Sequence, residues 1–245
     1  TGNTGVGYTT LESNTTGSNN TAVGSDALDA NTTADNNTAV GFESLSANTT
    51  GADNTAVGYY ALLVNTTATR NTAIGSDALA ANTTGDNNTA VGKAALAANT
   101  TADNNTAVGV SALTANTTGA ANTTTGFESL NANTTGEQNT AIGYRALLLN
   151  TTGAGNVAVG HSALDSNTTA DGNMAFGFQS LAANTTGTRN TAIGYQAYKA
   201  SDTENDNMAI GFQAMTTNTA GGTANIAIGN YALDALTSGD NNVAL

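Results

Sequence analysis

The chain has 245 residues, of which 5 are basic and 18 acidic, giving a net charge of −13. This acidic balance argues against nucleic acid as a partner, because too few basic side chains are present to neutralise phosphates. The sequence contains no cysteine for disulfides, and no apolar run approaches the roughly 20 residues of a membrane span, so we expect no membrane insertion.

Glycines recur at a constant interval, and this repeat dominates the sequence. They are Gly7, Gly24, Gly41, Gly58, Gly75, Gly92, Gly109, Gly126, Gly143, Gly160, Gly177, Gly194 and Gly211, followed by Gly229 at a step of 18. Glycine and β-branched residues in every unit disfavour helices, and the absence of Asn-Gly disfavours tight hairpins. The repeat therefore predicts an all-β, parallel β-solenoid (β-roll) of about 14 coils with 17 residues per coil.

Residues 1–245 are predicted to form a single continuous repeat domain. The chain begins and ends inside a repeat, so we expect it to be part of a longer fibrous protein.

Each coil opens on an asparagine four residues before its glycine. The members of this column are Asn20, Asn37, Asn54, Asn71, Asn88, Asn105, Asn122, Asn139, Asn156, Asn173, Asn190 and Asn207. A second asparagine column begins at Asn31 and recurs at Asn48 and Asn65. Amides stacked at a strand spacing of about 4.8 Å can bond to the copies above and below, so we predict two structural asparagine ladders.

A short strand follows the asparagine, as in Thr21-Ala22-Val23. Alternation places the first and third residues on one face and the alanine on the other. Because the threonine position becomes valine, methionine or isoleucine late in the chain, we expect that face to point inward. A leucine column, beginning at Leu28, is also expected inside, with the alanine two residues later, Ala30, on the same side. One valine and one leucine give thin cover for a coil, which favours self-association.

The position after the glycine concentrates aromatic residues. They are Tyr8, Phe42, Tyr59, Phe127, Tyr144, Phe178, Tyr195 and Phe212. Serine and lysine occupy the same column in other coils, so it cannot be a uniformly dry core. We expect these rings either to pack at a subunit interface or to stack on a ligand such as a cell-surface glycan.

Candidates for catalysis or metal binding are weak. His161 is the single histidine and stands in the variable position after Gly160, so we predict a solvated side chain, no catalytic residues and no cofactor. Acidic residues recur six positions before the glycine, at Asp35, Asp86, Asp103, Glu137, Asp171 and Asp240. The interruptions in this column disfavour a calcium-binding roll, and we predict no metal site, with calcium kept as the alternative.

The strand motif carries a family resemblance. Asn225-Ile226-Ala227-Ile228-Gly229 resembles the signature of trimeric autotransporter adhesin heads, and the fuller unit beginning at Asn54 is similar to repeats of phage tail fibres. The resemblance covers the whole chain. It implies a parallel β-roll, three chains around one axis and a role in binding surfaces, on a virion fibre or a cell surface. The adhesin unit is shorter than the unit of this chain, so turn geometry and handedness do not carry over.

We therefore expect a non-enzymatic, extracellular fibre or adhesin segment that forms a homotrimer and mediates surface attachment. One alternative is a subunit of a filament whose open coil ends stack head to tail. Another is an ice-binding solenoid, since Thr32-Thr33 and its copies repeat once per coil. Asn-Thr-Thr is also a glycosylation sequon, present in nearly every coil.

Overall fold

The computed structural model describes residues 2–217 and 221–245. The chain divides into two compact units, residues 1–122 and 123–245, and each is a run of the same coils. The first unit contains β1 (Thr4–Val6), β2 (Thr21–Val23), β3 (Thr38–Val40), β4 (Thr55–Val57), β5 (Thr72–Ile74), β6 (Thr89–Val91) and β7 (Thr106–Val108). The second contains β8 (Thr123–Thr125), β9 (Thr140–Ile142), β10 (Val157–Val159), β11 (Met174–Phe176), β12 (Thr191–Ile193), β13 (Met208–Ile210), β14 (Ile226–Ile228) and β15 (Val243–Ala244).

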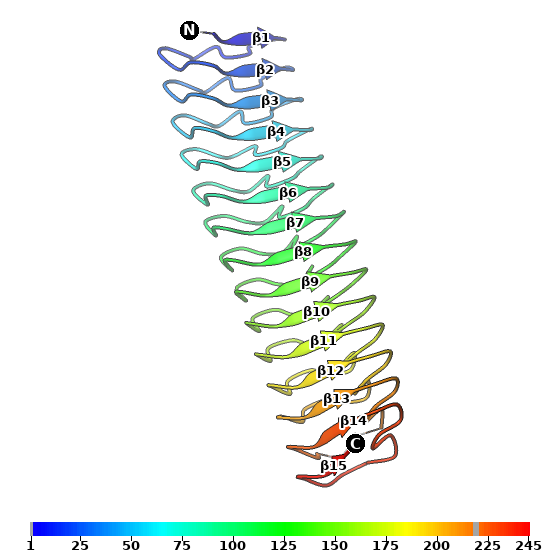
Figure 1. The fold of residues 1–245 in the computed structure, drawn as a ribbon. Helices are drawn as coiled ribbons and strands as arrows, with labels where there is room; N and C mark the ends of the chain where they lie inside the picture. The colour runs from blue at the N-terminus through cyan, green and yellow to red at the C-terminus, as the bar shows by residue number, and fades with distance from the viewer. Residues whose placement is uncertain (1, 218–220) are drawn as a thin grey trace. The chain divides into compact units, whose positions relative to one another are not determined.

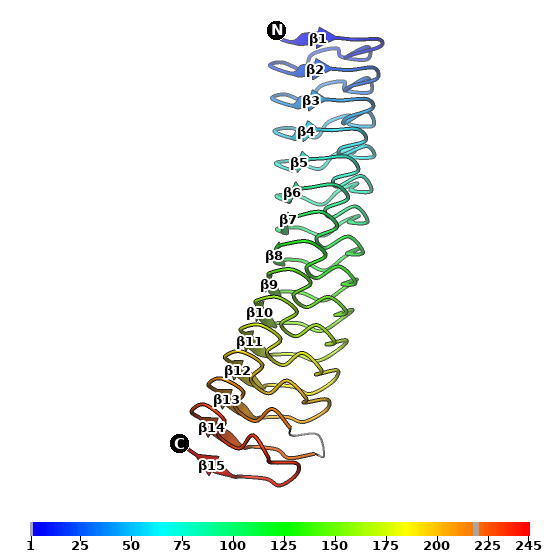
Figure 2. The same ribbon diagram turned by 90° about the vertical axis from the view of Figure 1, so that its right-hand side faces the viewer.

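Within each unit, successive strands pair in parallel and in register. Thr38, Ala39 and Val40 of β3, for example, lie opposite Thr55, Ala56 and Val57 of β4. Every strand therefore stacks on its own copy from the neighbouring coil, as Figures 1 and 2 show. The described residues contain no helix. The predicted all-β parallel solenoid with 17 residues per coil is confirmed.

Each strand ends at the regularly spaced glycine because the chain turns a corner there. Gly24 has a φ of +139°, and a Cβ on it would lie 2.3 Å from the carbonyl oxygen of Gly41 in the next coil. Only glycine combines this conformation with so close an approach of two backbones. The glycine period is thus the period of one corner of the solenoid.

At a second corner of the coil, a leucine adopts a left-handed backbone conformation, which is rare for this residue type. Leu28 has a φ of +52°, in the left-handed region, yet its side chain is 0% exposed. Its amide donates to the carbonyl of Ser44 in the next coil at 3.1 Å. Burial and this hydrogen bond offset a conformational cost of about 1–3 kcal/mol. The predicted inward leucine column is confirmed, and Tyr198 and Met215 occupy it in two later coils.

The strand buries the opposite face from the one that we predicted. Ala22 in the middle of β2 is 0% exposed, whereas Val23 is 36% exposed and Thr21 half-buried. The coil interior already holds a leucine and two asparagine amides, so it accommodates only a small side chain from the strand. The expectation for Ala30 was also wrong, because Ala30 is half-buried and the buried small residue is Ala27.

Thr124 confirms which residues of the strand point inward. It replaces the buried alanine in β8, and its hydroxyl hydrogen-bonds to that of Ser129, which is also buried. A hydroxyl in the core is tolerated here because the same coil supplies its hydrogen-bond partner.

Candidate interaction surface

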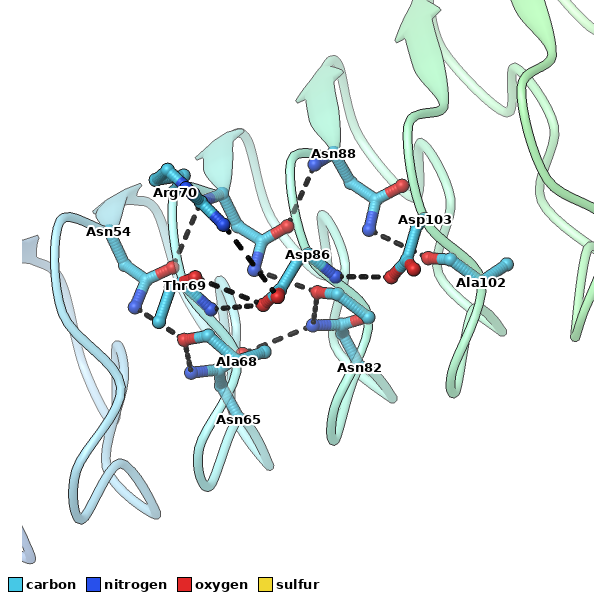
Figure 3. A network of polar contacts seen from close by, with 12 residues as sticks. Asn54, Asn65, Ala68, Thr69, Arg70, Asn82, Asp86, Asn88, Ala102 and Asp103 are labelled. Atoms are coloured by element: carbon cyan, nitrogen blue, oxygen red, sulfur yellow. Dashed lines mark hydrogen bonds and ion pairs between the residues drawn. The ribbon is translucent and has the colours of Figure 1, made fainter.

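The first asparagine ladder links backbone to side chain along the interior. The Asn37 amide N–H donates to Asn20 Oδ1 at 2.9 Å, and Asn37 Nδ2 donates to the carbonyl of Gly51 at 2.9 Å. The same pair of bonds recurs at Asn54 and Asn88. Figure 3 shows the bonds from Asn54 Nδ2 to Ala68 and from Asn88 Nδ2 to Ala102. All twelve predicted members are buried. This predicted structural ladder is confirmed.

The second ladder joins amide to amide. Asn82 Nδ2 donates to Asn65 Oδ1 at 3.1 Å and to the carbonyl of Gly85 at 3.0 Å. Figure 3 shows that amides of both columns converge on one carbonyl, as Asn54 and Asn65 do on Ala68. These sequon asparagines are fully buried and donate two hydrogen bonds, so their amide nitrogens are inaccessible in the folded coil.

The acidic column has a structural use that needs no metal. Asp86 Oδ1 accepts the backbone N–H of Thr69 at 2.6 Å and the Thr69 hydroxyl at 3.1 Å. Asp103 accepts the N–H of Asp86 at 2.7 Å in the same way. At Asp240, the N–H and hydroxyl of Thr223 hold the carboxyl pKa below its usual range. The carboxylates thus satisfy turn amides of the preceding coil.

Of each threonine pair in the turns, the first uses its hydroxyl internally. Thr32 Oγ1 donates to the carbonyl of Thr49 at 3.0 Å, and Thr66 Oγ1 donates to that of Thr83 at 3.2 Å. The second threonine, such as Thr33, is exposed. The two residues therefore do not form a paired surface array.

The outer side of the strands is a regular surface, and its chemistry differs between the units. In strands β2 to β7 of the first unit it consists of threonine and valine or isoleucine, and we call this part the Thr/Val face. Its members are Thr21, Val23, Thr38, Val40, Thr55, Val57, Thr72, Ile74, Thr89, Val91, Thr106 and Val108.

In the second unit the same positions are mostly apolar. This apolar strand face comprises Val157, Val159, Met174, Phe176, Ile193, Met208, Ile210, Ile226 and Ile228. Phe176 is 54% exposed, and Met174, Ile226 and Ile228 are also exposed. Large exposed apolar patches of this kind mark interaction surfaces.

The aromatic column follows the strands of both units, just past the glycine corner, and its eight predicted members are all exposed. In the second unit its rings stack continuously through Phe127, Tyr144, His161, Phe178, Tyr195 and Phe212, with centroids 4.9–5.4 Å apart. His161 therefore belongs to the stack, which our sequence reasoning missed although its position after Gly160 was the available signal.

Stacking limits how this column can bind a ligand. Tyr195 lies between Phe178 and Phe212 with interplanar angles of 9° on both sides. Because both faces of such a ring are covered by neighbours, mainly its edge is left for a partner. This geometry favours packing of ring edges against another surface over stacking of a sugar on a ring face.

The first unit has a smaller aromatic cluster. Phe42 stacks on Tyr59 at 5.5 Å, and Tyr60 lies 3.9 Å from Tyr59 between ring centroids. A side-chain hydrogen bond with Tyr59 raises the pKa of Tyr60 to about 12. Tyr8 stands apart and is the most exposed member of the column.

The described part of the chain shows no cavity, no group of three or more potential metal ligands and no helix able to cross a membrane. In comparisons with known proteins, no family model, no curated protein and no solved structure matches the chain.

Proposed function

We propose that the chain is a segment of an extracellular fibre or adhesin, and that its second unit associates with further copies through the apolar strand face. The observation that carries the proposal is the exposure of large apolar side chains, Phe176 foremost, on a regular sheet face. Burial of such side chains contributes about 1.5–3 kcal/mol each in favourable cases. These side chains are not part of the coil interior, which is filled by alanine, leucine and asparagine.

The repeat itself favours a second copy of the chain as the partner. The face presents one pair of outward side chains per coil, at a spacing of about 4.8 Å. A partner keeps contact over several coils only if it has the same spacing, and another copy of this solenoid does. The adjacent aromatic column adds exposed ring edges, including that of Phe178, to the same side of the corner.

The resemblance to trimeric adhesin heads and phage fibres supports three chains around an axis and an extracellular location. In such an assembly, attachment to a surface results from many weak contacts along a repetitive rod, whose combined avidity exceeds that of each contact.

Sedimentation of the full chain tests this function through a charge placed on the face. Phe176→Lys introduces a charge that must be desolvated on association, so we expect the wild-type oligomer to dissociate to the 24.1 kDa monomer. The matched control is Thr186→Lys, at an exposed position in the turn between β11 and β12. Because neither side chain is in the core, circular dichroism is expected to stay unchanged in both variants.

An unchanged oligomer in Phe176→Lys would overturn the proposed interface. Equal dissociation of the Thr186→Lys control would show that added charge alone separates the chains, which would also contradict the proposal.

A further inference from the structure

The Thr/Val face of the first unit repeats without interruption over six coils, from β2 to β7. Every outward position of these strands is a threonine followed, two residues later, by valine or isoleucine. None of the twelve side chains is charged. The face therefore combines rows of hydroxyl groups with rows of methyl groups, in contrast to the apolar strand face of the second unit.

The threonines of this face are half-buried, and the protein does not use their hydroxyls. Among the described residues, no hydrogen bond joins the hydroxyl of Thr38, Thr55 or any other threonine of the face to the protein, whereas Thr32 of the turn donates to a carbonyl. Each face threonine can thus bond to water through its hydroxyl, while its methyl group and the neighbouring valine border the same water.

The face is held rigid from behind. Its strands pair in register, as Thr55 with Thr72 and Val57 with Ile74, and the asparagine ladders fix the coil interior beneath them. The hydroxyl rows therefore keep a spacing of about 4.8 Å without any ordering on binding, which removes much of the entropic cost of forming many weak contacts at once.

We infer that the Thr/Val face of residues 21–108 binds crystalline water and is an ice-binding surface. An array of uncharged, regularly spaced hydroxyl and methyl groups can align water into a two-dimensional lattice, whereas charged side chains hold water in their own hydration shells. The threonine pairs of the turns, which the sequence suggested for this role, do not form the surface. The inference is independent of the association proposed for the second unit.

The test is ice-recrystallisation inhibition by the full chain, with one substitution on the face and one beside it. Thr72→Lys places a charge in the central strand β5, so we expect the inhibition to be lost. Thr67→Lys places the same charge at an exposed turn residue that precedes β5, and we expect it to retain wild-type activity. Both side chains lie outside the core, so both variants remain folded.

The same assay is run on Phe176→Lys, so that burial of the face in an assembly cannot hide the activity. Inhibition by this variant, with or without inhibition by the wild type, supports the ice-binding face. Absence of inhibition in both proteins overturns it, whatever their mass in solution. Equal loss in Thr72→Lys and Thr67→Lys would likewise overturn it, because the activity would then not reside on the face.

Discussion

At the scale of single residues, glycine is required at one position of each coil and is merely accepted at another. Gly160 has a φ of +132°, and a Cβ on it would lie 2.5 Å from the carbonyl oxygen of Gly177. Gly155 has a φ of +66° with open space around it, and Ala121 occupies the equivalent position in another coil with a φ of +58°.

Gly160→Ala is therefore expected to destabilise the second unit by more than the roughly 1–3 kcal/mol of backbone strain, because two backbones must also separate. Gly155→Ala, the control, is expected to cost only the roughly 1–2 kcal/mol of a left-handed alanine, the conformation that Ala121 already adopts. Urea unfolding followed by circular dichroism measures both. Equal effects of the two substitutions would contradict the backbone contact at this corner.

Asp165 lies in an environment that disfavours the ionised form of its carboxyl group. It is half-buried, its Oδ1 has no hydrogen-bond partner in the described structure, and burial raises its pKa. Leu148 and Ala182 occupy the same position in the neighbouring coils. A raised carboxyl pKa means that ionisation costs stability above the folded-state pKa and that the cost vanishes below the unfolded-state pKa.

Asp165→Ala is accordingly expected to stabilise the chain at pH 7 by about 0.5–1 kcal/mol, a value reduced because the group is partly exposed. The gain should shrink towards zero near pH 3, where the wild-type carboxyl is protonated. Denaturation midpoints at the two pH values measure this, and a gain that grows on acidification would refute the assignment.

At the scale of the structural element, the asparagine ladders hold the coils together. Asn82 is fully buried and takes part in three hydrogen bonds, to Asn65, Gly85 and Asn99. Asn87 stands five residues later in the same coil and is exposed.

We expect Asn82→Ala to cost about 2–5 kcal/mol, because it removes three bonds and leaves the buried Asn65 oxygen and Asn99 amide without these partners. Asn87→Ala, the matched control, is expected to cost less than about 1 kcal/mol. Thermal unfolding compares the two variants. A small loss for Asn82→Ala would mean that the ladder contributes geometry without stability.

The ladders and the leucine column were predictable because the constant period of the repeat brings identical side chains together once per coil. Which face of the strands is buried was not predictable. Alternation separates Thr21 and Val23 from Ala22 but does not say which of the two faces points inward. The pairing of Thr124 with Ser129 was the available signal, but it was weak: Ser44 and Ser180 occupy the Ser129 position while Ala39 and Ala175 remain unchanged.

Two further features of the elements lay beyond sequence reasoning. The left-handed backbone of Leu28 contradicts the usual preference of leucine, and only its burial in the folded coil accounts for it. Stacking in the aromatic column, with His161 included, depends on ring orientation, which a list of residue types does not contain.

At the scale of the whole molecule, the strand face that we expected in the core lies outside, and this changes what supports self-association. Side chains that the sequence assigned to a thin core lie on the surface, where they form the Thr/Val face of the first unit and the apolar strand face of the second. We expected self-association because the coil interior appeared poorly filled. The exposed apolar strand face, which includes Phe176, is now the reason to propose it.

Association of copies of this chain is measured by light scattering on the purified wild-type chain over a dilution series. If the apolar strand face joins the copies, we expect a discrete mass that does not change on dilution, three times 24.1 kDa for the proposed trimer. A mass of 24.1 kDa at every concentration would contradict it. Particles that grow with concentration would contradict it as well, and would point instead to end-to-end filament assembly.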